Sequence, residues 1–288
     1  MGKLLADAKR VAFQGEPGAY ANLAARESLS HVMAVPYPTF EDAVNAVREH
    51  EVDLCIIPVE NSLHGRIADI HHLLPEAGLY IVGEHFHRVR HQLLGVKGAS
   101  LAGLKTVFSQ GPALGQCRKI IRDMRLHAQN WHDTAGSARH VAELKDKSAC
   151  AIASSLAAEI YGLEILKADV EDEAHNMTRF LIMAAEADDA PADAGPVVTT
   201  FIFRVRNVPA ALYKALGGFA TNGVNMTKLE SYQLGGSFNA TQFYADIEGH
   251  PEERLVQLAL EELKFFTDRL SILGVYPAHP FRKQMPAI

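Results

Sequence analysis

Residues 186–198 form a stretch of acidic and small residues that divides this chain of 288 residues into two parts with different patterns. The stretch is built from Glu, Asp, Ala, Pro and Gly, and only its last two residues are larger and apolar. Such a composition is typical of a linker, and a chain of this length usually forms more than one core. We therefore predict a first domain over residues 8–186, a linker over 187–198 and a second domain over 199–277.

The first part alternates between strand patterns and helix patterns. Short apolar strands are expected near residues 11–13, 52–57, 106–108 and 149–153, and each is followed by a turn and a helix pattern. Pro58 is expected to end the second of these strands, and residues 180–185 to form a further buried strand. This alternation predicts an α/β architecture with a mostly parallel sheet.

The second part has another rhythm. Residues 200–206 alternate with period two, and a helix pattern follows with Leu212, Leu216 and Phe219 on one face. Strands are then expected over 225–232 and 240–247, joined by a hairpin turn at 234–237. A helix beginning at Pro251 and a last strand over 270–276 complete the order βαββαβ, which is the ferredoxin-like arrangement. A unit of this kind after a linker indicates a binding or regulatory module.

Charge and composition exclude several classes of function. The net charge is −6 without a long basic block, which argues against nucleic acid as a partner. No apolar run reaches the roughly 18 residues of a membrane helix, and the first ten residues lack the apolar core of a signal peptide. The widely spaced Cys55, Cys117 and Cys150 predict buried free thiols in a reducing compartment. We expect a cytoplasmic protein without membrane contact.

Polar residues follow several of the predicted strands. Glu60, Asn61 and Ser62 come after residues 52–57, Ser109 follows residue 108, and Thr134 lies three residues after Trp131. Each of them alone suits a simple helix cap. Because open α/β sheets bind ligands beyond the carboxyl ends of their strands, the set together predicts a receptor for a small polyanion.

Thr178 and Arg179 stand at the start of the apolar run 180–185. An Arg side chain offers a planar, permanently charged fork that matches a carboxylate in two places. A Thr side chain offers a short, stiff hydroxyl. The pair suits an acidic small molecule whose own hydroxyl must be held or expelled.

The histidines do not form a metal motif in the sequence. His85 and His87 share one face of a strand-like stretch, and His91 is close to them. A zinc site needs a third and a fourth ligand at a suitable spacing, and the neighbouring sequence does not supply them. The sequence therefore predicts no metal site.

Several motifs, taken in order, resemble the prephenate dehydratases of the monofunctional kind with a C-terminal ACT domain. They are Gly15-Glu-Pro-Gly-Ala-Tyr20, Pro58-Val-Glu-Asn-Ser62, Ala113-Leu-Gly-Gln-Cys117, Asn176-Met-Thr-Arg-Phe180 and Gly223-Val-Asn-Met-Thr-Lys-Leu-Glu-Ser231. The resemblance covers nearly all of residues 11–276. It implies a catalytic domain of two α/β lobes with a cleft between them, like a periplasmic binding protein, followed by a ferredoxin-like ACT domain.

The resemblance also implies a reaction and a set of site residues. The reaction is the conversion of prephenate to phenylpyruvate, with loss of carbon dioxide and water, in L-phenylalanine biosynthesis; no cofactor is needed. Thr178, Arg179 and Glu60 are the expected catalytic residues. The expected substrate-binding residues are Asn61, Ser62, Ser109, Gln116, Thr134, Ser137, Asn176 and Phe180. The expected L-phenylalanine effector site contains Ala210, Ala211, Leu212, Asn225, Met226, Glu230 and Ser231, in a homodimer or homotetramer formed through ACT domains.

The chain departs from the family pattern in two places. Gln110 stands in the run Ser109-Gln-Gly-Pro112, where the family often has Ser-His-Pro. Ala210 and the pair Tyr232-Gln233 stand where ACT domains usually carry the Gly of Gly-Ala-Leu and the Arg-Pro of Glu-Ser-Arg-Pro. Two alternatives stay open from the sequence: an arogenate dehydratase, and a solute-binding protein for small anions.

Overall fold

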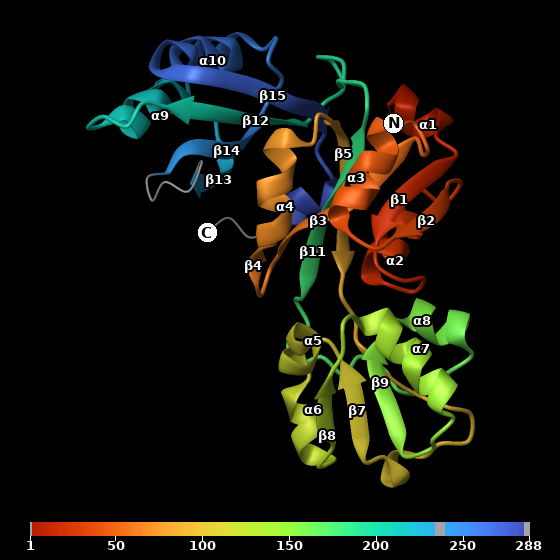
Figure 1. Ribbon diagram of the computed structural model, residues 1–288. Coiled ribbons are helices and arrows are strands. Elements are labelled where there is room, and N and C mark those ends of the chain that lie inside the picture. Colours follow the sequence, from red (N-terminus) through yellow and green to blue (C-terminus); the bar gives the residue numbers. More distant parts are fainter. Residues whose placement is uncertain (1, 234–239, 285–288) are drawn as a thin grey trace.

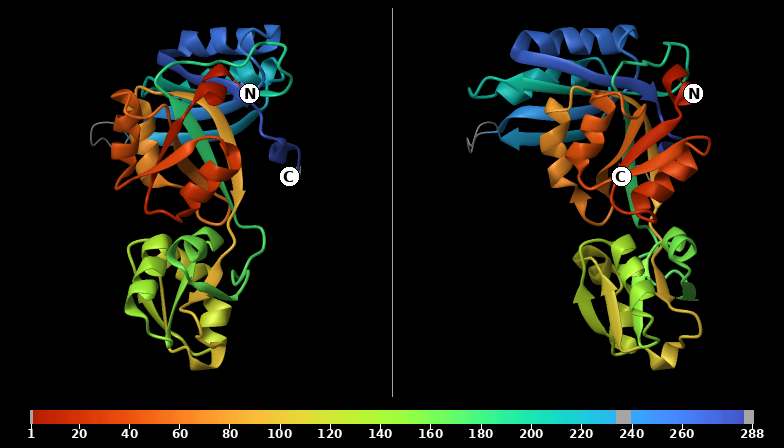
Figure 2. Two further views of the ribbon diagram at one scale, coloured as in Figure 1. Left: turned by 90° about the vertical axis from the view of Figure 1, so that its right-hand side faces the viewer. Right: turned by 45° about the vertical axis from the view of Figure 1, so that its right-hand side comes forward.

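The computed structural model describes residues 2–233 and 240–284, which form three sheets with their helices (Figure 1). The predicted hairpin turn at residues 234–237 lies outside the described residues. Both views of Figure 2 show an elongated molecule in which the second sheet lies at the end far from the third. In the described ranges, none of the helices combines the length and the apolar character that a bilayer crossing requires.

The first sheet has six strands and contains both ends of the predicted first domain. Its strand order is β2 (Met33–Tyr37), β1 (Arg10–Gln14), β3 (Leu54–Asn61), β11 (Met177–Ala184) and β5 (Tyr80–Arg88), with β4 (Gly65–Arg66) paired to β3. Its helices are α1 (Lys3–Asp7), α2 (Tyr20–Ser28), α3 (Phe40–Arg48) and α4 (Ala68–Leu73). The prediction of a mostly parallel sheet is wrong here, because only β1–β2 and β1–β3 are parallel, whereas β11 runs antiparallel to β3 and β5, and β4 runs antiparallel to β3.

The prediction that Pro58 ends its strand is wrong. Strand β3 continues through Pro58 to Asn61, and Pro58 lies opposite Phe180, where the β3–β11 register shifts. Proline lacks the N–H group of a regular ladder, and a bulge is one of the places in a sheet that accept it. The irregularity therefore carries β3 far enough to bring Glu60 and Asn61 alongside β11.

The second sheet forms a separate lobe. Its order is β10 (Glu164–Lys167), β6 (Gln92–Gly95), β9 (Ala149–Ala153), β7 (Thr106–Ser109) and β8 (His127–Asn130). The lobe also contains α5 (Gly111–Gln116), α6 (Arg118–Asp123), α7 (Thr134–Leu144) and α8 (Ser155–Tyr161). The helix pattern that follows residues 106–108 forms two helices instead of one, because Cys117 separates α5 from α6. The chain enters this lobe after β5 and leaves it before β11 (Figure 1).

The third sheet has the predicted order βαββαβ. Its strands lie in the order β13 (Met226–Gln233), β14 (Ala240–Glu248), β12 (Val197–Val205) and β15 (Thr267–Pro277), and every neighbouring pair is antiparallel. Helices α9 (Ala211–Thr221) and α10 (Arg254–Phe266) cover one face. Helix α10 begins three residues later than predicted, because Pro251 lies in the turn before it.

The other face of the third sheet packs on the first lobe. Ile202 and Tyr276 of this sheet share one buried core with Ile81 and Leu181 of the first. At Gly274 the two backbones approach so closely that a Cβ atom would collide with the carbonyl group of Ile81. The predicted linker is also anchored, because the buried Ala190 donates its N–H to the Val275 carbonyl at 2.8 Å.

Candidate active site

Strand β11 presents two different surfaces. Thr178 pairs with Asn61 on β3 and with His87 on β5, whereas Arg179 pairs with Glu60 and Phe86. Because successive side chains of a strand point to opposite faces, Thr178 and Arg179 cannot face the same cavity.

Thr178 lines a cleft of about 490 Å³ between the first and second lobes. The first lobe contributes Asn61, His64 and Phe180, and the second lobe contributes Gln116 and Thr134. Tyr20, His91, Gln110 and Asn176 also line it. No Lys or Arg is among the described residues that line this cleft. An anionic ligand there would have to be held by neutral donors and helix dipoles.

The Thr178 hydroxyl is oriented by Asn61. The Asn61 amide nitrogen donates to Thr178 Oγ1 at 3.0 Å. The Asn61 amide oxygen accepts from the backbone N–H groups of Leu63 and His64, at 3.0 and 3.1 Å, which fixes the amide nitrogen toward Thr178. The hydroxyl thus accepts one hydrogen bond from the protein, and its own proton is left to donate into the cleft.

Asn176 adds an unused donor beside this hydroxyl. Its amide oxygen accepts from Asn61 at 2.7 Å, and the residue is fully buried. Its amide nitrogen has no hydrogen-bond partner in the described part of the chain. A buried donor without a partner is costly, so this group is placed to be satisfied by a ligand.

A chain of hydrogen bonds crosses the cleft. His91 contacts the Tyr20 hydroxyl through Nδ1 and the Gln116 amide oxygen through Nε2, both at 2.7 Å. The Gln116 amide nitrogen donates to Nδ1 of His64 at 3.1 Å, which joins the second lobe to the first. Burial lowers the pKa of His91, although the contacts with Gln116 and Glu171 oppose that effect. His91 therefore links Tyr20 of the first lobe to Gln116 of the second.

The N-terminus of α2 also faces the cleft. Gly15, Ala19, Tyr20 and Ala21 line it, and the N-cap residue Ala19 gives the helix no side-chain cap. The first backbone N–H groups of a helix lack partners inside the helix, and the helix dipole adds positive charge there. Together they form a site suited to a carboxylate.

Contacts beside the cleft hold the two lobes together. The Arg139 guanidinium donates to both oxygens of Glu16 at 2.7 Å. The Ser154 hydroxyl donates to the Gly18 carbonyl at 2.6 Å. Gly18 has φ of +92° and lies directly against the backbone of α8, so glycine is required there both for conformation and for space.

Arg179 lies on the opposite face, inside a group of acidic side chains. Its guanidinium donates to Glu84 at 2.8 Å, to Glu60 at 2.9 Å and to Asp246 of the third sheet at 2.6 Å. The Tyr276 hydroxyl accepts from it at 2.9 Å. The expectation that Arg179 shares the substrate cleft with Thr178 is thus corrected, because protein carboxylates occupy its fork.

Glu60 belongs to this same group. Lys228 of the third sheet donates to it at 2.7 Å. Burial acts to raise the pKa of Glu60, but the cations Lys228 and Arg179 outweigh burial and lower the pKa to about 2. Glu60, one of the expected catalytic residues, is thus an ionised carboxylate paired with Arg179 and Lys228 in this arrangement, and it is not placed to supply a proton.

Comparisons with known proteins agree with this geometry. A model of the prephenate dehydratase family matches residues 11–188. The chain belongs to the prephenate dehydratase family. It is 51% identical, over 95% of its length and 98% of the relative's, to the bifunctional N-acyl-homoserine lactone acylase/prephenate dehydratase of Komagataeibacter europaeus. It is 38% identical to arogenate dehydratase 2 of Petunia hybrida, over 93% of this chain and 72% of that protein.

A solved structure supports the same assignment. The prephenate dehydratase of Arthrobacter aurescens in complex with L-Phe superposes with a TM-score of 0.85 at 26% identity, covering 97% of this chain and 92% of that one. Family membership makes the chain a dehydratase enzyme and sets aside a solute-binding protein as its function.

The structure gathers only part of the predicted substrate-binding set. Asn61, Gln116, Thr134, Asn176 and Phe180 line the cleft with Thr178. Ser109 and Ser137 do not line it, because both are fully buried in the second lobe and their hydroxyls donate to backbone carbonyl groups. The Ser62 hydroxyl donates to the His175 carbonyl, and Ser62 lines a different cavity.

That second cavity has a volume of about 1030 Å³ and lies between β11 and the third sheet. Its lining includes Glu60, Arg88, Arg179, Lys228 and Asp246. Although it is the larger cavity, we assign the chemistry to the cleft, because Thr178, the unpaired amide of Asn176 and the uncapped helix α2 meet there.

The predicted effector residues fall on two segments of the third sheet unit. Ala210 is the N-cap of α9, and Ala211 and Leu212 begin that helix. Asn225 precedes β13, which contains Met226, Glu230 and Ser231. Glu230 and the Ser231 carbonyl contact Arg66 of β4 at 3.6 and 3.4 Å. This end of β13 therefore touches the first lobe next to Asn61.

Sequence reasoning did not predict His64, His91, Tyr20 and Gln110 as residues that line this cleft. Tyr20 lies in the motif Gly15-Glu-Pro-Gly-Ala-Tyr20, so its position was a usable signal. His64 was not detectable, because its place depends on the tight β3–β4 connection, in which Asn61 pairs with Gly65.

Proposed function

We propose that the chain converts prephenate to phenylpyruvate, with loss of carbon dioxide and water, as a step of L-phenylalanine biosynthesis. The observation that carries the proposal is the Thr178 hydroxyl, which lines the cleft and accepts a hydrogen bond from the Asn61 amide, so that its own proton is available to a ligand. Family membership supports the reaction class.

The reaction needs a donor at one position. As the ring carboxylate leaves as carbon dioxide, its electron pair aromatises the ring and expels the C4 hydroxyl, which takes up a proton from solvent and departs as water. A Thr hydroxyl is too weak an acid to be ionised at neutral pH, so Thr178 acts as a hydrogen-bond donor to the departing oxygen. The interaction strengthens as negative charge grows on that oxygen, which lowers the barrier instead of only binding substrate.

The rest of the substrate is held without Arg or Lys. The Asn176 amide and the N-terminus of α2 supply donors for carboxylate groups. A weakly held ring carboxylate suits the chemistry, because strong stabilisation of a group that must leave would raise the barrier. Gln116 and Thr134, which are expected substrate-binding residues, line the cleft, where they can donate hydrogen bonds to the substrate.

We further propose that residues 199–277 are an ACT domain that binds L-phenylalanine between Ala210–Leu212 of one subunit and Asn225–Ser231 of its neighbour, in a homodimer or homotetramer. The L-Phe complex of the A. aurescens relative supports an effector of this kind. A chain of contacts connects this domain to the cleft and can transmit the effect of L-phenylalanine. Lys228 of β13 bonds Glu60, Glu60 bonds Arg179, and Arg179 adjoins Thr178.

The substrate assay compares two acids. Purified protein is given prephenate and arogenate in separate reactions, and phenylpyruvate or phenylalanine is quantified. We expect turnover of prephenate. Arogenate is included because plant relatives carry its name. N-acyl-homoserine lactone forms a third reaction, because the name of the K. europaeus relative joins both activities. A folded protein that turns over neither acid would refute the proposal.

The effector assay uses the full chain. L-phenylalanine is titrated against the initial rate, and its binding is measured by calorimetry. The variant Lys228→Met should bind L-phenylalanine but respond to it more weakly, because the contact with Glu60 is lost. Lys264→Met, an exposed change on α10, is the control. Equal inhibition of the Lys228 variant and the wild type would exclude this route.

A further inference from the structure

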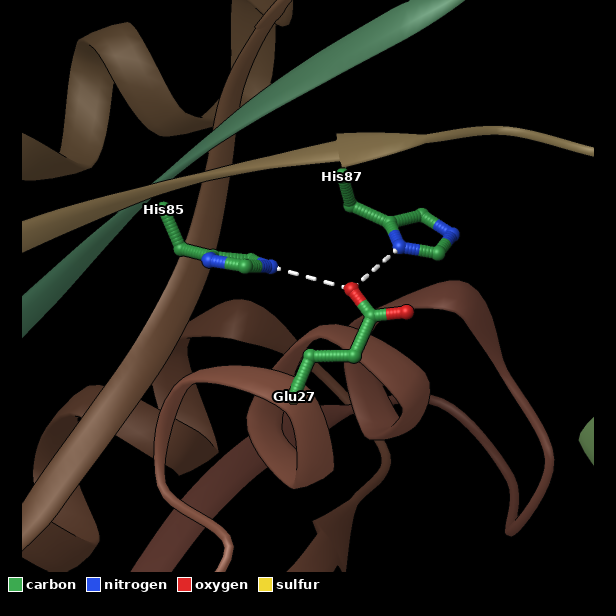
Figure 3. A group of neighbouring side chains, drawn as sticks. All are labelled: Glu27, His85 and His87. Carbon is green, nitrogen blue, oxygen red and sulfur yellow. Dashed lines mark hydrogen bonds and ion pairs between the residues drawn. The ribbon is translucent and has the colours of Figure 1, made fainter. Parts of the chain in front are cut away.

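Glu27, His85 and His87 converge on one point of the first lobe. His85 and His87 lie two residues apart on β5, so both side chains project from the same face of the strand, while Glu27 comes from α2 (Figure 3). Nε2 of His85 and Nδ1 of His87 contact the same carboxylate oxygen of Glu27, at 3.0 and 2.8 Å. Two ring nitrogens and a carboxylate therefore meet, although Glu27 is 58 residues away from His85 in the sequence.

The spacing of these atoms suits a metal ion. One ligand atom from each residue can be chosen so that all three lie within 4.8 Å of one another. Zinc binds imidazole nitrogen and carboxylate oxygen at about 2.0–2.2 Å, so two ligands of a tetrahedral ion lie about 3.3 Å apart. The two contacts with Glu27 are shorter than this spacing by a few tenths of an ångström, at 3.0 and 2.8 Å. The two ring nitrogens lie within 4.8 Å of each other, so side-chain rotations must adjust the separations of the three ligands around an ion.

The surroundings leave room for further ligands. The Glu27 side chain is 44% exposed, whereas those of His85 and His87 are 14% and 5% exposed. A cavity of about 610 Å³ adjoins the cluster and is lined by Glu27 and His87. One buried and one partly buried histidine on a strand, one exposed carboxylate and an open side describe a three-ligand site completed by water.

His91 does not compete for a place in the cluster, because Tyr20 and Gln116 occupy both of its ring nitrogens.

We propose that Glu27, His85 and His87 bind one divalent transition-metal ion, for which Zn²⁺ is the best match. The ligands are Nε2 of His85, Nδ1 of His87 and a carboxylate oxygen of Glu27, with water in the remaining position. Binding of the ion requires both imidazole rings to be neutral and Glu27 to be ionised. The ion would tie α2 to β5 beside the cleft, on the face of the first sheet that carries Thr178, because His87 pairs with Thr178 and His85 pairs with Phe180 across the β5–β11 ladder.

The test measures binding of the metal alone. Full-length protein is treated with a chelator, dialysed and titrated with ZnCl₂ by calorimetry, and Co²⁺ is added in parallel to record its visible absorption. We expect one ion per chain and the absorption bands of a low-coordinate Co²⁺ site. No heat and no bands at millimolar metal would overturn the proposal.

Matched variants locate the site. Glu27→Gln and His85→Ala should each weaken Zn²⁺ affinity at least about tenfold, since the loss of a metal ligand's outer partner alone already costs about that factor. Both positions lie at the rim of the cluster, so these variants do not rely on the more buried His87. His175→Ala is the control, because His175 faces a single carboxylate, Glu173, at 3.9 Å and is 70% exposed.

The melting temperature provides a second readout. Zn²⁺ should raise it in the wild type and in His175→Ala, but not in Glu27→Gln, because an ion stabilises only the state that binds it. Unchanged Zn²⁺ affinity in both Glu27→Gln and His85→Ala would place the binding elsewhere and refute the site.

Discussion

Thr178 and Arg179 are adjacent on β11, yet one lines the catalytic cleft and the other is bonded to Asp246 of the third sheet. The period of a strand makes this division unavoidable. As a result, one peptide unit separates the group that we assign to the chemistry from a buried ion network that spans two domains. Any shift of the third sheet against the first lobe must act on β11 at this point.

The first prediction concerns Thr178. Thr178→Val keeps the shape of the side chain and removes the donor, so kcat should fall by about two to three orders of magnitude with little change in KM. Steady-state kinetics with prephenate checks this. Thr178→Ser retains the hydroxyl and should keep most of the activity. Near-normal kcat in the Val variant would remove Thr178 from the mechanism.

The second prediction concerns the stability contributed by Arg179. Replacing it with Met leaves Glu84 and Asp246 buried without their cation, and the loss of one partner of a buried ion pair costs about 3–5 kcal/mol. Chemical unfolding followed by circular dichroism should show that loss. Arg206→Met breaks an exposed pair with Asp268 and should cost less than about 1 kcal/mol. Equal effects of the two changes would contradict the structural role of Arg179.

The third prediction follows from the lowered pKa of Glu60. A carboxyl group whose folded pKa is about 2 and whose ordinary pKa is 4.5 binds fewer protons in the folded state over that range. Its contribution to stability is complete above pH 4.5 and is lost as the pH falls toward 2. The free energy of unfolding should therefore depend less on pH in this window in Glu60→Gln than in the wild type. Glu159→Gln, which changes an exposed side chain, should keep the wild-type slope.

Much of the architecture was predictable, because it rests on local signals. The βαββαβ order follows from side-chain periodicity, and the place of Thr178 follows from its motif at the start of a strand. The error at Arg179 arose from treating Thr178 and Arg179 as one unit, although strand alternation alone assigns them to opposite faces. The sequence already held the information that corrects that prediction.

Other features could not be predicted, because they depend on long-range packing. The composition of residues 187–198 indicates a linker but not that Ala190 is buried against β15. Lys228 and Asp246 reach Arg179 only because the third sheet docks on the first lobe. The meeting of Glu27 with His85 and His87 likewise depends on how α2 packs across β5.

The fourth prediction tests that docking. Gly274→Ala would place a Cβ atom against the Ile81 backbone, and a backbone contact cannot be relieved by turning a side chain. We expect a loss of about 1–3 kcal/mol in the free energy of unfolding, as for other overpacked sites. Gly217→Ala is the control, because a Cβ atom there meets no atom within 4 Å. Gly217 lies inside α9, so replacing it with Ala should raise the free energy of unfolding slightly. A neutral Gly274 variant would show that the two sheets are not held this closely.

The fifth prediction concerns Ala210, the N-cap of α9. Its φ of +60° lies in the left-handed region, where an L-residue with a Cβ atom pays about 1–2 kcal/mol and glycine does not. Ala210→Gly should therefore raise the free energy of unfolding by about 1 kcal/mol. The extra chain entropy that glycine brings to the unfolded state reduces this gain. Ala220→Gly, an exposed helical position near the other end of α9, should lower stability by up to about 1 kcal/mol. If Ala210 is strained, thermal unfolding should show a gain of stability for Ala210→Gly and a loss for Ala220→Gly. A loss of stability in both variants would show that the α9 N-cap is not strained.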